Sequence, residues 1–270
     1  MTNTFRTPAV AGRFYPSDVE MLEYAILEAS ESIPKDKKKV IAAVSPHAGY
    51  AYSGAVAAQT IGQIEIPETV ILLGPNHTGK GAPIGLSTAT WEMPMGNVPV
   101  DQDMARELLA ETDYVKEDEL AHRYEHSIEV QIPFLQMYQP KLSIVPLSIS
   151  HVSYAVVDEI GLALTEVIRR SGKEVLILAS SDMTHYESRE VAEKKDHYVL
   201  KKLADMDPHL LYRSVTGHQI SMCGIMPVTI ALIAAIELGA TKTELVQYTD
   251  SGAITGDIEQ VVGYAGVLIS

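Results

Sequence analysis

Four side chains that can bind a metal ion or carry a proton each follow an apolar run that ends abruptly. They are His47, His77, Asp182 and His185. Neutral imidazoles bind zinc, copper and iron, and a nearby carboxylate can orient a ligand or exchange a proton with a substrate. Because the same arrangement recurs at distant places in the chain, we expect these side chains to meet in one site.

A single cysteine extends this set. Cys223 lies just before an apolar segment whose composition predicts a buried helix. A helix N-terminus stabilises negative charge, so we expect the thiolate of Cys223 to be favoured and to bind metal. Two imidazoles and a thiolate suit iron, copper or zinc, whereas calcium and magnesium prefer oxygen ligands. The residue types therefore predict a metal ion between His47, His77 and Cys223.

Each of these residues also has an ordinary structural explanation. A lone cysteine is more often a small buried hydrophobe, and histidines after strands can bind backbone groups in tight turns. Asp182 can form an Asx turn or cap a helix. Glu125 and His126, judged by the physics of the sequence alone, are residues at a helix start. The repetition of histidines after apolar runs is what favours the metal hypothesis.

The elements that must position these residues follow a clear pattern. Four runs rich in Val, Ile and Leu stop at polar loops: Val40–Val44, Val70–Leu73, Leu142–Ile149 and Val175–Ala179. Continuous apolar runs are typical of strands covered on both faces, as in parallel sheets flanked by helices. In open α/β sheets ligands bind beyond the carboxyl ends of the strands, which is where the candidate residues fall.

Helical patterns lie between these runs, and the C-terminal part differs. Helices are expected over three segments with polar starts, Asp101–Ala110, Ser153–Arg170 and Ser188–Ala204. Two further strands are expected over Glu244–Thr249 and Gly263–Ile269, and Ala82–Pro99 is expected to be a long loop. The sequence therefore predicts a single α/β domain over residues 1–270, a sandwich with a mostly parallel central sheet flanked by helices.

Composition argues against several classes of partner. The 270 residues include 35 acidic and 21 basic side chains, and the formal charge of -14 opposes nucleic acid and anionic membranes. The most apolar stretch, Ile225–Ala235, is well short of the roughly 20 residues that span a bilayer. A single cysteine cannot form an internal disulfide. We therefore expect a cytoplasmic protein that binds neither nucleic acid nor a membrane.

Six short motifs together carry a family resemblance. They are Ala11–Pro16, Pro46–Tyr50, Gly74–His77, Glu125–Glu129, Ser180–Asp182 with His185, and Cys223–Gly224. In this order they resemble the MEMO family, also called AmmeMemoRadiSam system protein B, over nearly the whole chain. The resemblance implies a fold similar to the class III extradiol dioxygenases. Those enzymes hold ferrous iron with two histidines and one carboxylate, and they use a further histidine as acid–base catalyst.

The resemblance also implies a ligand set. Carried over by position, His47 and His77 match the two metal-binding histidines of the family, and Cys223 matches the third ligand. A soft thiolate in place of the dioxygenase carboxylate changes the metal preference and the redox potential. Ring cleavage therefore does not follow from the resemblance in fold alone.

Other residues are expected to support the metal. We assign proton transfer to His185, and to Asp182 the orientation of that imidazole or of the substrate. His126, Tyr50 and Tyr186 are expected to form a second layer around the ligands.

Two functional hypotheses use this cleft. In the first, the protein is a non-haem iron or copper enzyme, with zinc as the alternative metal, that performs redox or dioxygenase-like chemistry on an unknown small molecule. In the second, the same cleft holds a metal or a peptide without chemistry. Zinc-dependent hydrolysis with Asp182 as base is a third and weaker hypothesis. The family name further implies a radical SAM protein of the same system as a partner.

Overall fold

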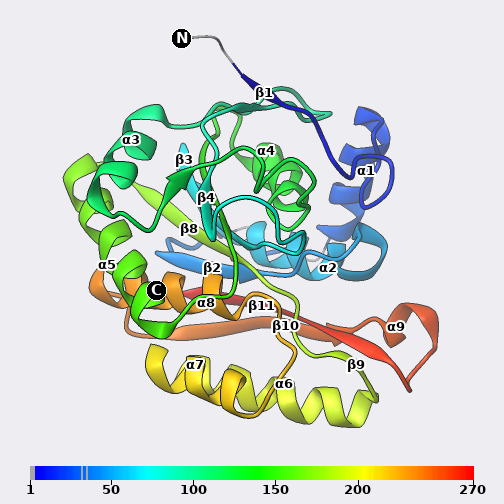
Figure 1. Cartoon of the computed structure of the whole chain (residues 1–270). Helices are drawn as coiled ribbons and strands as arrows, with labels where there is room; N and C mark the ends of the chain where they lie inside the picture. Colours follow the sequence, from blue (N-terminus) through cyan, green and yellow to red (C-terminus); the bar gives the residue numbers. More distant parts are fainter. Residues whose placement is uncertain (1–3, 32, 35) are drawn as a thin grey trace.

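One mixed β-sheet runs through the centre of the protein, and helices cover both of its faces (Figure 1). The computed structural model describes residues 4–31, 33–34 and 36–270. The strands follow the order β10-β11-β2-β8-β3-β7-β4-β6, and β9 pairs with β11. This architecture confirms the predicted α/β sandwich.

The centre of the sheet is parallel and buried. Its strands are β2 (Ala42–Ser45), β8 (Val175–Ser180), β3 (Thr69–Pro75) and β7 (Ser143–Ile149). Neighbours in this group pair in parallel, and nearly all of their residues are buried. They correspond to the four apolar runs of the sequence, because a strand covered on both faces needs apolar side chains on both.

The outer strands are shorter or antiparallel. They are β11 (Val261–Ile269), β10 (Thr243–Asp250), β9 (His185–Glu187), β4 (Ile84–Leu86) and β6 (Lys116–Glu117). A separate pair joins β1 (Phe5–Arg6) to β5 (Thr90–Trp91). The prediction of a loop over Ala82–Pro99 is wrong, because β4 and β5 lie within it. These strands are too short to produce a pattern, and β4 forms by pairing along β7.

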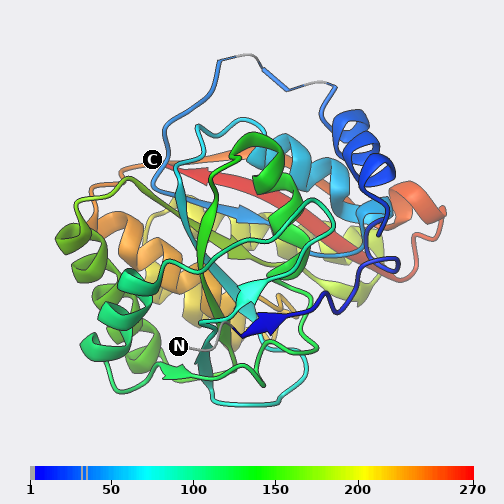
Figure 2. The same ribbon diagram turned by 90° about the horizontal axis from the view of Figure 1, so that it is seen from above.

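The helices divide into two layers (Figures 1 and 2). One face of the sheet carries α1 (Val19–Ala29), α2 (Tyr50–Ile61) and α4 (Ile132–Tyr138), which follows the short helix η1 (Glu129–Gln131). The other layer consists of α3 (Gln102–Glu111), α5 (Tyr154–Ser171), α6 (Arg189–Ala204), α7 (Pro208–Gly217) and α8 (Ile225–Glu237). A one-turn helix, α9 (Gly252–Thr255), joins β10 to β11. The three predicted helices correspond to α3, α5 and α6.

The apolar helix α8 is buried between the sheet and α5. It packs on β2, β8 and β3 on one side and on α5 on the other, which explains why apolar residues occur around its whole circumference. A Cβ at Gly161 would lie 2.6 Å from Ile233 Cγ2, so glycine permits the close approach of α5. Among the described residues, no helix is both long and apolar enough to cross a membrane.

Candidate metal centre

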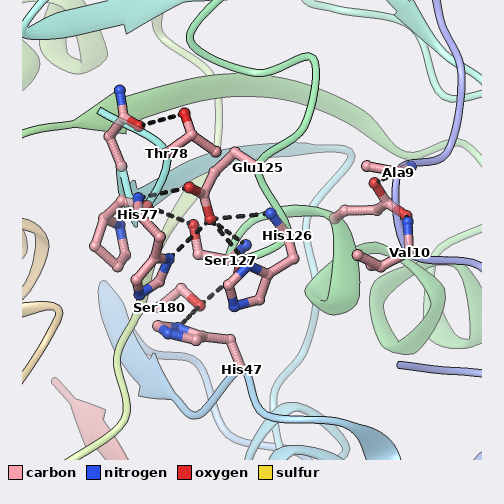
Figure 3. A network of polar contacts seen from close by, with 12 residues as sticks. Ala9, Val10, His47, His77, Thr78, Glu125, His126, Ser127 and Ser180 are labelled. Atoms are coloured by element: carbon pink, nitrogen blue, oxygen red, sulfur yellow. Dashed lines mark hydrogen bonds and ion pairs between the residues drawn. The ribbon is translucent and has the colours of Figure 1, made fainter. Parts of the chain in front are cut away.

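Three imidazole rings meet beyond the carboxyl ends of the central strands (Figure 3). His47 follows β2, His77 follows β3, and His126 lies in the loop before η1. One ring nitrogen from each lies within 4.8 Å of the other two. The rings of His77 and His126 stack with their centroids 4.6 Å apart. Three nitrogens this close can bind one metal ion and leave coordination positions open.

A close approach of two segments brings His126 to this end of the sheet. A Cβ at Gly74, in β3, would lie only 2.5 Å from the Oγ atom of Ser127. The Ser127 hydroxyl donates to the Pro75 carbonyl at 2.9 Å. Glycine at position 74 is therefore what leaves room for the segment that carries His126.

The buried carboxylate of Glu125 holds two of the three rings. Its Oε1 lies 2.9 Å from His77 Nδ1 and 3.3 Å from His126 Nδ1, while Oε2 accepts the His77 backbone N–H. Burial alone would raise the pKa of Glu125, but hydrogen bonds from His77 and Ser127 and the nearby imidazoles lower it to about 2. The ionised carboxylate occupies the Nδ1 side of both rings and leaves each Nε2 free for a metal.

A serine hydroxyl holds the third ring. His47 Nδ1 lies 2.9 Å from the Oγ atom of Ser180, the last residue of β8. The backbone N–H of His47 donates to Asp182 Oδ1 at 2.8 Å. Burial, followed by three neighbouring imidazoles, lowers the pKa of His47 well below its ordinary value of 6.5. The ring is therefore neutral, which is the form that binds a metal ion.

Cys223 lies against His47, outside the trio of mutually close imidazoles. Its Sγ is 3.2 Å from His47 Nε2, and it accepts the backbone N–H of Asp182 at 3.2 Å. Burial, with the charge of Asp182, raises the pKa of the Cys223 thiol. In the protein without metal, burial therefore opposes the thiolate that the helix start was expected to favour. Metal binding favours the thiolate again by replacing the proton.

Asp182 and His185 carry groups suited to proton exchange. Burial raises the pKa of the Asp182 carboxyl to about 6. His185 Nδ1 lies 2.8 Å from the Met183 carbonyl oxygen and 2.9 Å from that of Ser221. Carbonyl oxygens only accept hydrogen bonds, so in the neutral ring Nδ1 carries the hydrogen and Nε2 carries the lone pair.

The chain has counterparts among known proteins. A family model described as Memo-like protein matches residues 6–268. The chain belongs to the Memo family. This membership confirms the resemblance carried by the six motifs.

Memo relatives match the chain along its length. A MEMO1 family protein of Methanococcoides burtonii is 42% identical over 265 residues, which cover 98% of this chain and 99% of the relative. A MEMO1 family protein of Aquifex aeolicus is 44% identical over 265 residues, which cover 97% and 98%. The crystal structure of an uncharacterized protein of Escherichia coli K12 aligns with a TM-score of 0.60 and 14% identity, covering 85% of this chain and 100% of that one. That likeness concerns the fold alone.

The three residues expected in a second layer lie in different places in this Memo protein. His126 joins the trio itself. The Tyr50 hydroxyl donates to the Val130 carbonyl at 2.8 Å, and its ring stacks on Phe134, so Tyr50 belongs to the packed core. Tyr186 is 74% exposed with a positive φ of 57°, and its ring centroid lies 5.8 Å from that of His185.

The sequence predicted for His126 only a place in a second layer around the ligands. The other two imidazoles of the trio follow strands, whereas His126 lies in an irregular loop with no periodic pattern around it. The available signal was its neighbour Glu125, because a buried carboxylate beside a histidine is a common way to orient a metal ligand.

Proposed function

We propose that this Memo protein holds one transition-metal ion between His47, His77 and His126. The observation that carries the proposal is the closeness of one ring nitrogen from each, within 4.8 Å of the other two. The second nitrogen of each ring faces an oxygen of Ser180 or Glu125. Such outer partners fix the tautomer and orientation of imidazoles that bind metals.

The identity of the metal follows from the donor atoms. Imidazoles suit iron, copper and zinc alike. Cys223 Sγ lies 3.2 Å from His47 Nε2, near enough to join the metal as a thiolate, and the family resemblance makes it the third ligand beside His47 and His77. A thiolate among imidazoles suits iron, copper and zinc, and of these only iron and copper are redox-active. We therefore infer iron or copper, with zinc as the alternative.

The chemistry inferred for this site is redox or dioxygenase-like conversion of a small molecule. A redox-active ion would supply the electron-transfer capacity. The chain itself would move protons: His185 offers a free Nε2, and the Asp182 carboxyl has its pKa raised to about 6, close to neutral pH. Asp182 also fixes the loop of His47 by accepting its backbone N–H, so one side chain can both exchange a proton and position His47.

The partners and the compartment are further parts of the proposal. The substrate is a small molecule or a peptide that reaches the strand-end site, and a radical SAM protein of the same system is the protein partner. The formal charge of -14 argues against nucleic acid and membranes. A lone thiol stays reduced in the cytoplasm, where we place the protein.

Metal analysis after anaerobic purification tests the proposal. We expect the wild-type protein to bind one equivalent of iron or copper, and His77→Ala and His126→Ala to lose it. His197→Ala is the matched control, because His197 is an exposed histidine on α6 and should retain the metal. Wild-type protein that binds no iron, copper or zinc would refute the site.

A cysteine variant separates the two ligand sets. If the three imidazoles hold the ion, Cys223→Ser keeps the metal at lower affinity. If His47, His77 and Cys223 hold it, Cys223→Ser loses the metal and His126→Ala retains it. Oxygen consumption by the metal-loaded protein then distinguishes an enzyme from a binding module, which would hold the metal without turnover.

A further inference from the structure

A chain of buried hydrogen bonds lies behind His47, on the side away from Cys223. Gln131 Nε2 donates to Ser180 Oγ at 2.9 Å and to the Pro46 carbonyl at 2.8 Å. The Ser180 hydroxyl donates to the Ser127 carbonyl at 2.6 Å. The fourth contact of this chain joins Ser180 Oγ to His47 Nδ1 at 2.9 Å.

Backbone carbonyls fix the direction of every bond in this chain. The Pro46 carbonyl can only accept, so the Gln131 amide must present its nitrogen on this side, where Nε2 also lies 2.9 Å from Ser180 Oγ and 3.4 Å from the Ser45 carbonyl. The Ser127 carbonyl can also only accept, so it takes the single hydrogen of the Ser180 hydroxyl. Ser180 has no hydrogen left to donate to the imidazole, and the imidazole must donate to Ser180.

We propose that Ser180 is a positioning residue that holds His47 as the Nδ1–H tautomer and thereby makes Nε2 the atom that binds metal. In a neutral imidazole one nitrogen carries the hydrogen and the other carries the lone pair. The lone pair of Nε2 then faces Cys223 Sγ, 3.2 Å away, and can accept the thiol hydrogen. The inference deepens the proposed metal site and rests on it for the effect on metal affinity, whereas the tautomer is a property of the protein itself.

Removing the hydroxyl removes this control. In Ser180→Ala nothing at position 180 accepts the Nδ1 hydrogen, so the Nε2–H tautomer becomes accessible and can donate to Cys223 Sγ. That tautomer directs a hydrogen at the position of the metal and must rearrange before Nε2 can bind. Loss of such an outer partner typically weakens metal binding about 10- to 100-fold.

Nitrogen NMR of the metal-free, ¹⁵N-labelled full chain tests the tautomer directly. Two-bond ¹H–¹⁵N correlations distinguish a protonated from an unprotonated ring nitrogen, and the His47 signals are assigned by their absence in His47→Gln. We expect a protonated Nδ1 and an unprotonated Nε2 in the wild-type protein at neutral pH. A protonated Nε2 in the wild type would overturn the proposal without any further variant.

The variants separate positioning from general structure. We expect Ser180→Ala to show the Nε2–H form or a mixture of both, and Ser180→Thr, which keeps the hydroxyl, to restore the wild-type spectrum. Ser148→Ala is the matched control, since Ser148 is a buried serine on β7, which β3 separates from β8, and its hydroxyl has no hydrogen-bond partner among the described residues. A wild-type tautomer in Ser180→Ala refutes the role of Ser180.

Metal titration distinguishes this inference from the proposed function. With Zn²⁺ as the probe, we expect the dissociation constant of Ser180→Ala to rise about 10- to 100-fold, and that of Ser148→Ala to stay unchanged. A wild-type protein with the expected tautomer but no metal binding would contradict the proposed function and leave the tautomer intact. Equal affinities of wild type and Ser180→Ala would contradict the positioning role in metal binding.

Discussion

Glu125 and Glu129 lie close together in one short motif, and both are almost completely buried, with 1% and 0% of their surface exposed. Glu125 accepts hydrogen bonds from the rings and backbone of the metal-site loops, and both His77 and His126 depend on it. Glu129 makes no contact of that kind. Its side chain binds the N-terminal segment of the chain instead.

Four donors surround Glu129. Oε2 accepts from Arg6 at 2.7 Å and from the Ala9 N–H at 2.8 Å, and Oε1 accepts from the Val10 N–H at 3.0 Å and from the Tyr15 hydroxyl at 2.8 Å. Both carboxylate oxygens are therefore occupied by two backbone N–H groups, a phenol and a guanidinium.

The difference shows how a carboxylate that only ties the fold together can be told from one that lies against candidate metal ligands. Both are buried and both are fully hydrogen-bonded, so burial and partner number do not separate them. The chemistry of the donors does: each imidazole that faces Glu125 has a second ring nitrogen that can bind a metal, whereas the guanidinium that faces Glu129 has only hydrogen-bond donors. Arg6 also donates to the Glu125 backbone carbonyl at 2.7 Å, so the residue that pairs with Glu129 also helps to hold the segment of Glu125.

The largest effect is expected on stability when Glu129 is truncated. Glu129→Ala leaves the buried guanidinium of Arg6 without its carboxylate, and breaking a buried ion pair from one side costs about 3–5 kcal/mol. The free energy of unfolding, measured by urea titration, should fall by this amount. A decrease below about 1 kcal/mol would show that the N-terminal segment does not depend on this carboxylate.

Acid should lower the stability of the folded protein through His126. Burial lowers the pKa of His126 from 6.5 to about 4, against the attraction of Glu125. Below pH 6.5 this histidine is protonated in the unfolded chain, whereas in the folded chain it becomes protonated only at about pH 4. The free energy of unfolding therefore falls as the pH decreases through this window, by about 3 kcal/mol from His126 alone.

Urea titrations with a chelator, at several pH values across this window, check the effect. His126→Gln should flatten the dependence on pH by the part that His126 contributes. Glu129→Gln is the control and should lower stability at every pH while keeping the loss of stability toward acid that His126 contributes. An unchanged slope in His126→Gln would contradict the assignment.

Glu125→Gln is expected to separate the two carboxylates by function. The amide keeps the shape of the side chain but removes the charge that orients His77 and His126, and we expect the affinity for Zn²⁺ to fall about 10- to 100-fold. Isothermal titration calorimetry measures the loss. Glu129→Gln, matched in chemistry and in burial, should bind Zn²⁺ with an affinity close to that of the wild type, and equal losses in the two variants would break the comparison.

The meeting of His47 and His77 could be predicted from the sequence because both follow continuous apolar runs. Such runs give parallel strands, and parallel strands bring their carboxyl ends to one edge of a sheet. The two rings indeed lie with their centroids 5.1 Å apart. A continuous apolar run can be recognised in the local sequence, and general rules of sheet packing then place its carboxyl end.

The place of His126 and the state of Cys223 could not be predicted in this way. His126 reaches the site through a contact between Ser127 and the backbone at Gly74, which has no signature in either segment alone. For Cys223 the local sequence shows a helix start that favours a thiolate. The opposing effect, burial beside Asp182, depends on the tertiary structure and raises the pKa of the thiol.

The smallest effect is expected when a single donor to Glu129 is removed. Tyr15→Phe removes the hydroxyl that donates to Glu129 at 2.8 Å but leaves the three other donors in place. We expect the free energy of unfolding to fall by about 1–1.5 kcal/mol, the usual size of one buried hydrogen bond, and the affinity for Zn²⁺ to stay unchanged. Urea titration and calorimetry on the same preparation measure both quantities. A loss of metal affinity in Tyr15→Phe would mean that the N-terminal segment positions the imidazoles through Glu129, and the two carboxylates would then act as one unit.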